Sequence, residues 1–133
     1  MPDSVAPVAT ILGEGPVWIA RDAALWFVDI KAPAIYRFDP ATGAERHWPA
    51  PAQVGWVLPH SDGGLIVGLQ NGLARFDPAS GAFAFIGAVE LRLPYNRLND
   101  ATTDPDGRLW FGSMDDAEAA PSGHFYRAES PGW

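Results

Sequence analysis

The sequence predicts an all-β fold made of four-stranded antiparallel units that follow one another about every 40 residues. The main observation is an internal repeat, YRFDPATG at residues 36–43 and ARFDPASG at residues 74–81, with the two copies 38 residues apart. The 133 residues also contain 14 glycines and 13 prolines, which interrupt the chain too often for long helices. The apolar residues form short continuous runs, as in strands covered on both faces.

The first unit is expected over about residues 14–50. In its turn Asp39–Gly43, the aspartate can accept hydrogen bonds from the following backbone, the proline fixes φ, and the glycine tolerates a positive φ. This combination is typical of a hairpin turn between two strands. The expected strands are residues 14–18, 25–30, 34–39 and 45–50.

The second unit, about residues 54–88, repeats this pattern, and a third begins near residue 99. Only residues 115–120 predict a helical turn, which Pro121 limits. We therefore expect residues 1–133 to form one partial β-propeller of about two and a half blades, the third incomplete and running over about residues 99–133. The expected strands are 54–59, 64–69, 72–77 and 83–88 in the second unit, and 99–104, 108–114 and 123–128 in the third.

An open stack of this size leaves apolar blade faces uncovered at both ends. Repeat proteins need capping units or closure to stay in solution. We therefore expect the protein to need the remaining blades of a propeller, or self-association.

Composition excludes several classes of function. The 9 Lys and Arg residues against 16 Asp and Glu residues give a net charge of −7, which disfavours binding to nucleic acid. There is no cysteine, so disulfides and thiolate metal sites are excluded. No run approaches the ~18 apolar residues of a membrane span, and residues 1–12 lack the basic start of a secretory signal. These features predict a cytoplasmic protein with no membrane partner.

The first candidate site residue is Glu14, which two glycines flank at the start of an apolar run. Glycines let the backbone approach a ligand closely, and a carboxylate at a strand start can bind a hard divalent cation. The alternative for this motif alone is an exposed glutamate in a turn.

The second candidate is the polar cluster Tyr95–Asp100 at the start of the third unit. Because alternate residues of a strand face opposite ways, Arg97 and Asn99 are expected to point together and offer hydrogen-bonding groups to a hydroxylated ligand. The alternative is a set of hydrogen bonds that closes a loop. Trp26 and Trp110 occupy equivalent places in their units and are expected in the core between blades.

Four segments in this order and spacing resemble the regucalcin/gluconolactonase family, also called senescence marker protein-like, and in particular the N-terminal part of its bacterial sugar lactonases. The resemblance covers nearly the whole chain. It implies a six-bladed propeller that hydrolyses aldonolactones to aldonic acids, a carboxylic ester hydrolase activity. The segments are LGEGPVW at 12–18, LWFVDI at 25–30, NRLND at 96–100 and DGRLWFGSM at 106–114.

The resemblance also implies one divalent metal ion in the central channel, with calcium, zinc, manganese, magnesium and iron left open. Glu14 matches the family's first metal ligand, and Arg97 and Asn99 match residues that contact the substrate. Two further ligands, an asparagine and an aspartate that is the family's base, come from later blades without a counterpart here, so no catalytic residue is assigned in this chain. A substrate-contacting glutamate of the family falls at Ala117, with three acidic neighbours: Asp115, Asp116 and Glu118.

The expected function is metal-dependent hydrolysis of a sugar lactone, with this chain as the N-terminal part of the enzyme. By itself, the chain is not expected to be an efficient lactonase. The alternative is a catalytically silent propeller piece that binds ligands or protein partners through its blade faces.

Overall fold

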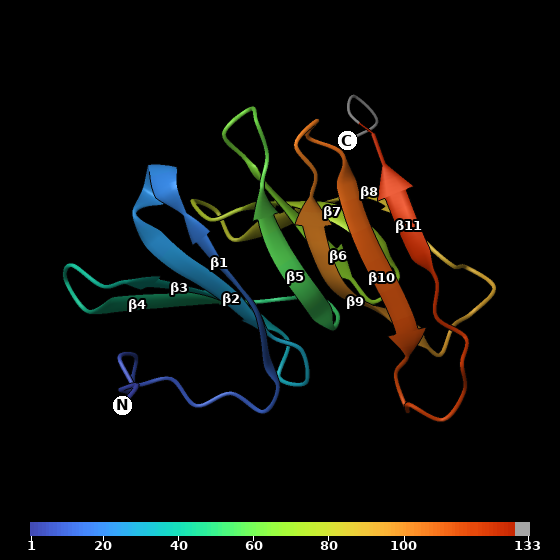
Figure 1. Cartoon of the computed structure of the whole chain (residues 1–133), viewed down its shortest axis with the longest axis horizontal. Coiled ribbons are helices and arrows are strands. Elements are labelled where there is room, and N and C mark those ends of the chain that lie inside the picture. The colour runs from blue at the N-terminus through green and yellow to red at the C-terminus, as the bar shows by residue number, and fades with distance from the viewer. Residues whose placement is uncertain (130–133) are drawn as a thin grey trace.

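Three antiparallel β-sheets make up the computed structural model, which describes residues 1–129 (Figure 1). Eleven strands and one short 3-10 helix account for the regular structure of these residues. In Figure 1 the first sheet, in blue and teal, lies at one end of the molecule and the third, in orange and red, at the other. The all-β prediction is confirmed.

The first sheet has the strand order β1-β2-β3-β4. Its β3–β4 turn has the predicted chemistry: the Asp39 carboxylate accepts a hydrogen bond from the Ala41 backbone N–H (2.9 Å). Gly43 has φ +73° and donates its N–H to the Asp39 carbonyl (2.8 Å). The elements are β1 (Gly13–Ile19), η1 (Ala20–Asp22), β2 (Ala24–Asp29), β3 (Ala34–Asp39) and β4 (Ala44–Pro49).

The second sheet repeats this order, β5-β6-β7-β8, and its β7–β8 turn repeats the same chemistry at Asp77 and Gly81. The third sheet has three strands in the order β11-β10-β9 among the described residues. Its first strand begins at Asn96 rather than at residue 99, because Asn96 pairs with Asp115. The strands are β5 (Val54–Pro59), β6 (Leu65–Leu69), β7 (Gly72–Asp77), β8 (Ala82–Ala88), β9 (Asn96–Thr103), β10 (Leu109–Asp115) and β11 (Phe125–Ala128).

Two apolar clusters join the sheets. The first packs the first sheet against the second and includes Trp26, which stacks on Trp48 with ring centroids 5.6 Å apart. The second packs the second sheet against the third and includes Trp56 and Phe111. Each large side chain buried in this way contributes roughly 1.5–3 kcal/mol. The assignment of residues 1–133 to one partial propeller with fixed blade limits stays a prediction.

The two tryptophans expected in the core have different surroundings. Trp26 is 1% exposed, as expected, whereas Trp110 is 40% exposed on a face of the third sheet that no other described sheet covers, so its place between blades stays a prediction. Its neighbour Phe111 faces the second sheet, and the alternation of a strand therefore places Trp110 on the outer face. There its indole N–H donates a hydrogen bond to Asp104 (2.8 Å).

Candidate functional site

The first strands of the three sheets, β1, β5 and β9, lie next to one another, and each contains a β-bulge. In β1, Gly15 and Pro16 lie between the residues paired with Val28 and Trp26. In β9, Leu98 pairs with Ser113 and Ala101 pairs with Phe111. The two residues between them, Asn99 and Asp100, therefore lie opposite the single residue Gly112. Bulges redirect side chains and are common beside active sites. The bulges of β1 and β9 lie in the segments 12–18 and 96–100 that the sequence singles out.

Glycines allow the bulged strands to approach closely. Gly15 has φ +59°, and a Cβ atom at this position would lie 3.4 Å from the Gly55 carbonyl oxygen. A Cβ atom at Gly55 would lie 2.6 Å from the Leu98 carbonyl oxygen, closer than any real contact. Strand β5 therefore needs glycine at this position to fit against β9.

The three bulged strands line a cavity of about 410 Å³. Two carboxylates, Glu14 from β1 and Asp100 from β9, lie on its wall, and both residues are exposed. The remaining lining residues are Gly15, Pro16, Val17, Trp56, Val57, Leu58, Ala101 and Thr102. We call this space the channel cavity. Sequence reasoning treated Asp100 only as part of a polar cluster, and its proximity to Glu14 comes from the packing of strands that are distant in the sequence.

Arg97 and Asn99 are not among the residues that line the channel cavity. Arg97 is 5% exposed, and its Nε donates a hydrogen bond to Asp116 Oδ1 (2.9 Å). Asn99 is exposed at the bulge. The convergence of Glu14, Arg97 and Asn99 on one ligand therefore stays a prediction.

Asp116, directly after β10, binds side chains from all three sheets or the loops beside them. Lys31 Nζ lies 2.6 Å from its Oδ1 and Gln53 Nε2 lies 3.2 Å from its Oδ2, in addition to the bond from Arg97. The hydrogen bond from Lys31 lowers the pKa of Asp116, and those from Gln53 and Arg97 add to this effect against the opposing effect of burial. The sequence alone does not single out Lys31 or Gln53, because they are 85 and 63 residues away from Asp116.

The other acidic residues near Ala117 have different roles. Asp115 is buried, and its carboxylate accepts hydrogen bonds from the backbone N–H groups of Ala119 and Ala120, each at 2.9 Å. Glu118 is exposed, with φ +56°. Among these three residues, Asp116 is the one in contact with Arg97.

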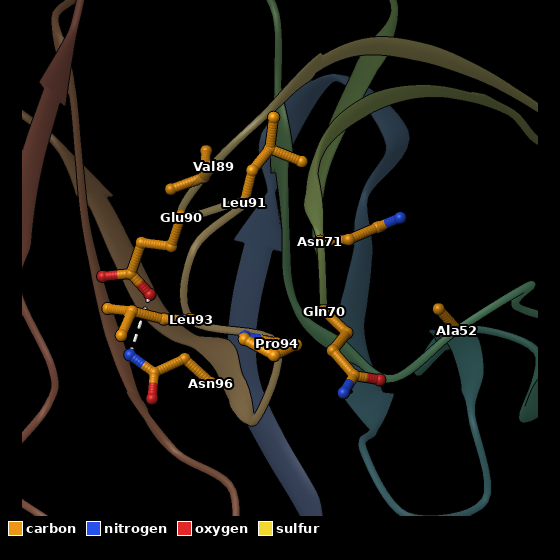
Figure 2. Close-up of a pocket in the computed structure, with 9 residues that line it drawn as sticks. All are labelled: Ala52, Gln70, Asn71, Val89, Glu90, Leu91, Leu93, Pro94 and Asn96. Carbon is orange, nitrogen blue, oxygen red and sulfur yellow. Dashed lines mark hydrogen bonds between the residues drawn. The ribbon is translucent and has the colours of Figure 1, made fainter.

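A second cavity, of about 310 Å³, lies between the β6–β7 turn and the β8–β9 loop (Figure 2). Figure 2 shows Glu90 and Asn96, joined by a hydrogen bond, on one side and Gln70 on the other. Glu90 also accepts hydrogen bonds from Ser113, His124 and Tyr126, at 2.6, 3.0 and 2.6 Å.

Burial raises the pKa of Glu90, but the hydrogen bonds from Ser113, Tyr126, Asn96 and His124 together lower it below its ordinary value. Burial raises the pKa of Tyr126, and the Glu90 carboxylate adds to this effect, so that the pKa of Tyr126 is raised to about 12. The Ser113 hydroxyl and the His124 ring both contact this carboxylate rather than each other, so they do not form a nucleophile–base pair. Glu90 instead fixes the β8–β9 loop to the third sheet.

The donor chemistry of the channel cavity suits a hard divalent cation, but the number of donors does not. Glu14 and Asp100 offer carboxylate oxygens, whereas such cations take six or more oxygen ligands. Within residues 1–129, no three His, Cys, Asp or Glu side chains lie close enough to hold a metal ion. These residues do not form a complete metal site.

Among residues 1–129, no helix has the length and apolar character needed to span a membrane.

Comparisons with known proteins match nearly the whole sequence. The family described as "SMP-30/Gluconolactonase/LRE-like region" matches residues 12–132. An L-arabinolactonase of Azospirillum brasilense is 38% identical over 92% of this chain, and a 6-deoxy-6-sulfogluconolactonase of Pseudomonas putida is 31% identical over 79%. The chain spans only 42% and 36% of the length of these two relatives.

Solved structures show the same fold. A calcium-binding protein, regucalcin, from Agrobacterium tumefaciens superimposes with a TM-score of 0.87 and 26% identity, over 92% of this chain and 42% of that structure. A gluconolactonase from Xanthomonas campestris superimposes with a TM-score of 0.77 and 20% identity, over 97% of this chain and 47% of that structure. The second likeness is one of fold alone. Together these structures confirm the predicted propeller class.

Proposed function

The chain belongs to the SMP-30/gluconolactonase/LRE-like family, and on this premise we propose that the protein hydrolyses a sugar lactone to its aldonic acid. Relatives with lactonase names support this reaction class, and one of them is 38% identical to this chain. The observation that carries the proposal is Glu14, an exposed carboxylate on the wall of the channel cavity, in the segment that matches the family.

We assign Glu14 as one ligand of a divalent metal ion, with further ligands from outside this chain. A bound divalent cation would polarise the lactone carbonyl group. The regucalcin with a similar structure is a calcium-binding protein by name, which supports a metal of this kind. Because residues 1–129 do not form a complete metal site, we derive no catalytic step through the metal.

We assign Arg97 and Asn99 as substrate-binding residues. Arg97 has a guanidinium fixed by Asp116, and a fixed donor loses little conformational entropy when it binds a sugar oxygen. Asn99 is exposed at the β9 bulge, next to Asp100 on the channel cavity, and its amide can donate and accept hydrogen bonds.

The proposal is tested by measuring hydrolysis of L-arabinono-1,4-lactone and D-glucono-1,5-lactone with a pH indicator, after subtraction of the spontaneous rate. The 133-residue chain and any longer product of the same reading frame are assayed with calcium, zinc, manganese, magnesium or iron(II), and with a chelator. We expect metal-dependent hydrolysis by a product that supplies the further ligands. A reading-frame product that binds metal but accelerates neither lactone would contradict the proposal.

A catalytically silent binding module is the second candidate. The absence of a group of three metal-binding side chains within residues 1–129 favours it for this chain alone. The same assay separates the two, because a binding module would bind an aldonolactone or an aldonate without turnover.

A further inference from the structure

The contacts of Asp116 define a small cluster at one edge of the three sheets, made of Asp116, Lys31, Arg97 and Gln53. Gln53 and Arg97 lie just before or at the start of the first strand of their sheets. Lys31 and Asp116 lie just after the second strand of theirs. Because the first two strands of each sheet are antiparallel, all four residues lie at the same end of their sheets. We call this set the Asp116 cluster. It connects the first sheet to the third at the end of the sheets where Glu14, near the start of β1, lines the channel cavity.

Arg97 is fixed at one side of its guanidinium and open at the other. Its Nε binds Asp116 at 2.9 Å, and its Nη1 makes only a long bond of 3.4 Å to the Leu98 carbonyl. Its Nη2 has no partner among the described residues, although the side chain is only 6% exposed. Nη2 is not among the fully buried side-chain nitrogens without a hydrogen-bond partner in this part of the chain, which are those of Trp26 and Trp56. This geometry offers one positioned donor to a ligand.

Lys31 offers a second donor near the first. Its Nζ makes one hydrogen bond among the described residues, to Asp116, and its side chain is 36% exposed. An ammonium group has three N–H donors, so two remain available. The Asp29 carboxylate accepts hydrogen bonds from the backbone N–H groups of both Leu12 and Lys31, each at 3.1 Å, which places Lys31 beside the start of β1 and Glu14.

Lys31 and Arg97 share one carboxylate, so the four side chains of the Asp116 cluster carry one net positive charge, while the Asp29 and Glu14 carboxylates lie at the same end of the sheets. A neutral hydroxylated ligand uses only the hydrogen bonds of such a pair, whereas an anionic ligand also gains from the charge.

We propose that Lys31 is a specificity-determining residue that binds an anionic oxygen of the ligand, and that Asp116 is the positioning residue that holds Lys31 and Arg97 together for this purpose. This inference rests on the proposed lactone site. The ligand class is an aldonate, the ionised product of lactone hydrolysis, or a sugar lactone with an anionic substituent.

The test measures binding rather than turnover, by calorimetric titration of the protein with L-arabinonate and with the neutral L-arabinitol. Lys31→Met should weaken L-arabinonate binding by about 10-fold, the effect of one charge-assisted hydrogen bond, and leave L-arabinitol within about 2-fold. For the Asp116→Asn variant, Asp62→Asn is the matched control, because Asp62 is an exposed carboxylate paired with Arg75 at the opposite end of its sheet.

Asp116→Asn separates positioning from simple electrostatics by the sign of its effect. Removal of a negative charge beside two cations would tighten L-arabinonate binding if charge alone mattered. If Asp116 positions the cations, Asp116→Asn weakens this binding, Asp116→Glu restores part of it, and the Arg97 Nε–H resonance in ¹⁵N NMR spectra loses its protection from solvent exchange. Tighter binding in Asp116→Asn, or unchanged Arg97 protection, would overturn the positioning role.

Failure of the inference is distinct from failure of the proposed function. A protein that hydrolyses lactones but binds L-arabinonate equally well with and without Lys31, or does not bind it at all, retains the proposed function and refutes the inference. A protein without lactonase activity in which Lys31→Met selectively weakens L-arabinonate binding supports the anion site and refutes only the hydrolytic role. Lys31 is partly exposed, so its variant decides the question even if an Asp116 variant fails to fold.

Discussion

Replacement of Gly55 by alanine should force strands β5 and β9 apart. The added Cβ atom would lie 2.6 and 2.7 Å from the carbonyl oxygens of Leu98 and Asn99. Ordinary contact begins at 3.4 Å, so the two strands must separate by about 0.8 Å or distort. Both obstacles are backbone atoms, which cannot rotate away as the end of a flexible side chain can. Overpacking of this kind costs about 1–3 kcal/mol.

The assay is urea unfolding followed by tryptophan fluorescence, because Trp56 is buried next to the affected contact. Gly55→Ala should lower the unfolding midpoint at an unchanged slope. Gly87→Ala is the matched control, since a Cβ atom at Gly87 meets nothing within 4 Å and its φ is not positive. This control should be neutral or stabilising by about 0.4–1 kcal/mol. Equal stability of Gly55→Ala and the unchanged protein would refute the close packing of the bulged strands.

Three further predictions concern other parts of the molecule. Gly68→Ala should destabilise the protein by about 1–3 kcal/mol, because the added Cβ atom would lie 2.2 Å from Trp56 Nε1. A urea unfolding midpoint equal to that of Gly87→Ala would contradict this contact. Glu90→Gln should cost about 1–3 kcal/mol at pH 7, since Ser113 and Tyr126 lose an ionised acceptor, and urea unfolding measures this loss. The folded pKa of Glu90 is lowered, so its contribution is complete above the unfolded value of about 4.3 and is lost as the pH falls through the folded pKa. The difference between the unchanged protein and Glu90→Gln should therefore shrink from pH 7 to pH 3, and a constant difference would show that ionisation of Glu90 does not matter.

Local chemistry made the hairpin turns predictable. Both Asp-Pro-Ala-(Ser/Thr)-Gly turns form with the expected hydrogen bonds and positive φ at Gly43 and Gly81, because every interaction lies within five residues. The other strand limits agree with the expected ones to within two residues, apart from the earlier start of β9 at Asn96.

Long-range contacts could not be predicted in this way. Lys31 meets Asp116 across 85 residues, and no local pattern distinguishes Lys31 from a solvated surface lysine. The burial of Trp110 between blades is not tested, because Trp110 lies on the face of the third sheet that no other described sheet covers. The bulge at Asn99 and Asp100 interrupts the simple alternation from which Arg97 and Asn99 were expected to point together. That pairing remains a prediction.

The measurement that tests the central claim most directly is the effect of Glu14→Gln on lactone hydrolysis and on metal affinity. Glu129→Gln is the matched control, an exposed glutamate paired with Arg127 and not among the lining residues of the channel cavity. In a lactone-hydrolysing product of this reading frame, Glu14→Gln should weaken divalent-metal binding by about 10–100-fold and reduce kcat/KM at limiting metal in proportion, because one charged oxygen ligand is lost. Glu129→Gln should change neither. Full activity and unchanged metal affinity in Glu14→Gln would contradict the account, because the channel cavity would then not be the metal-dependent lactone site.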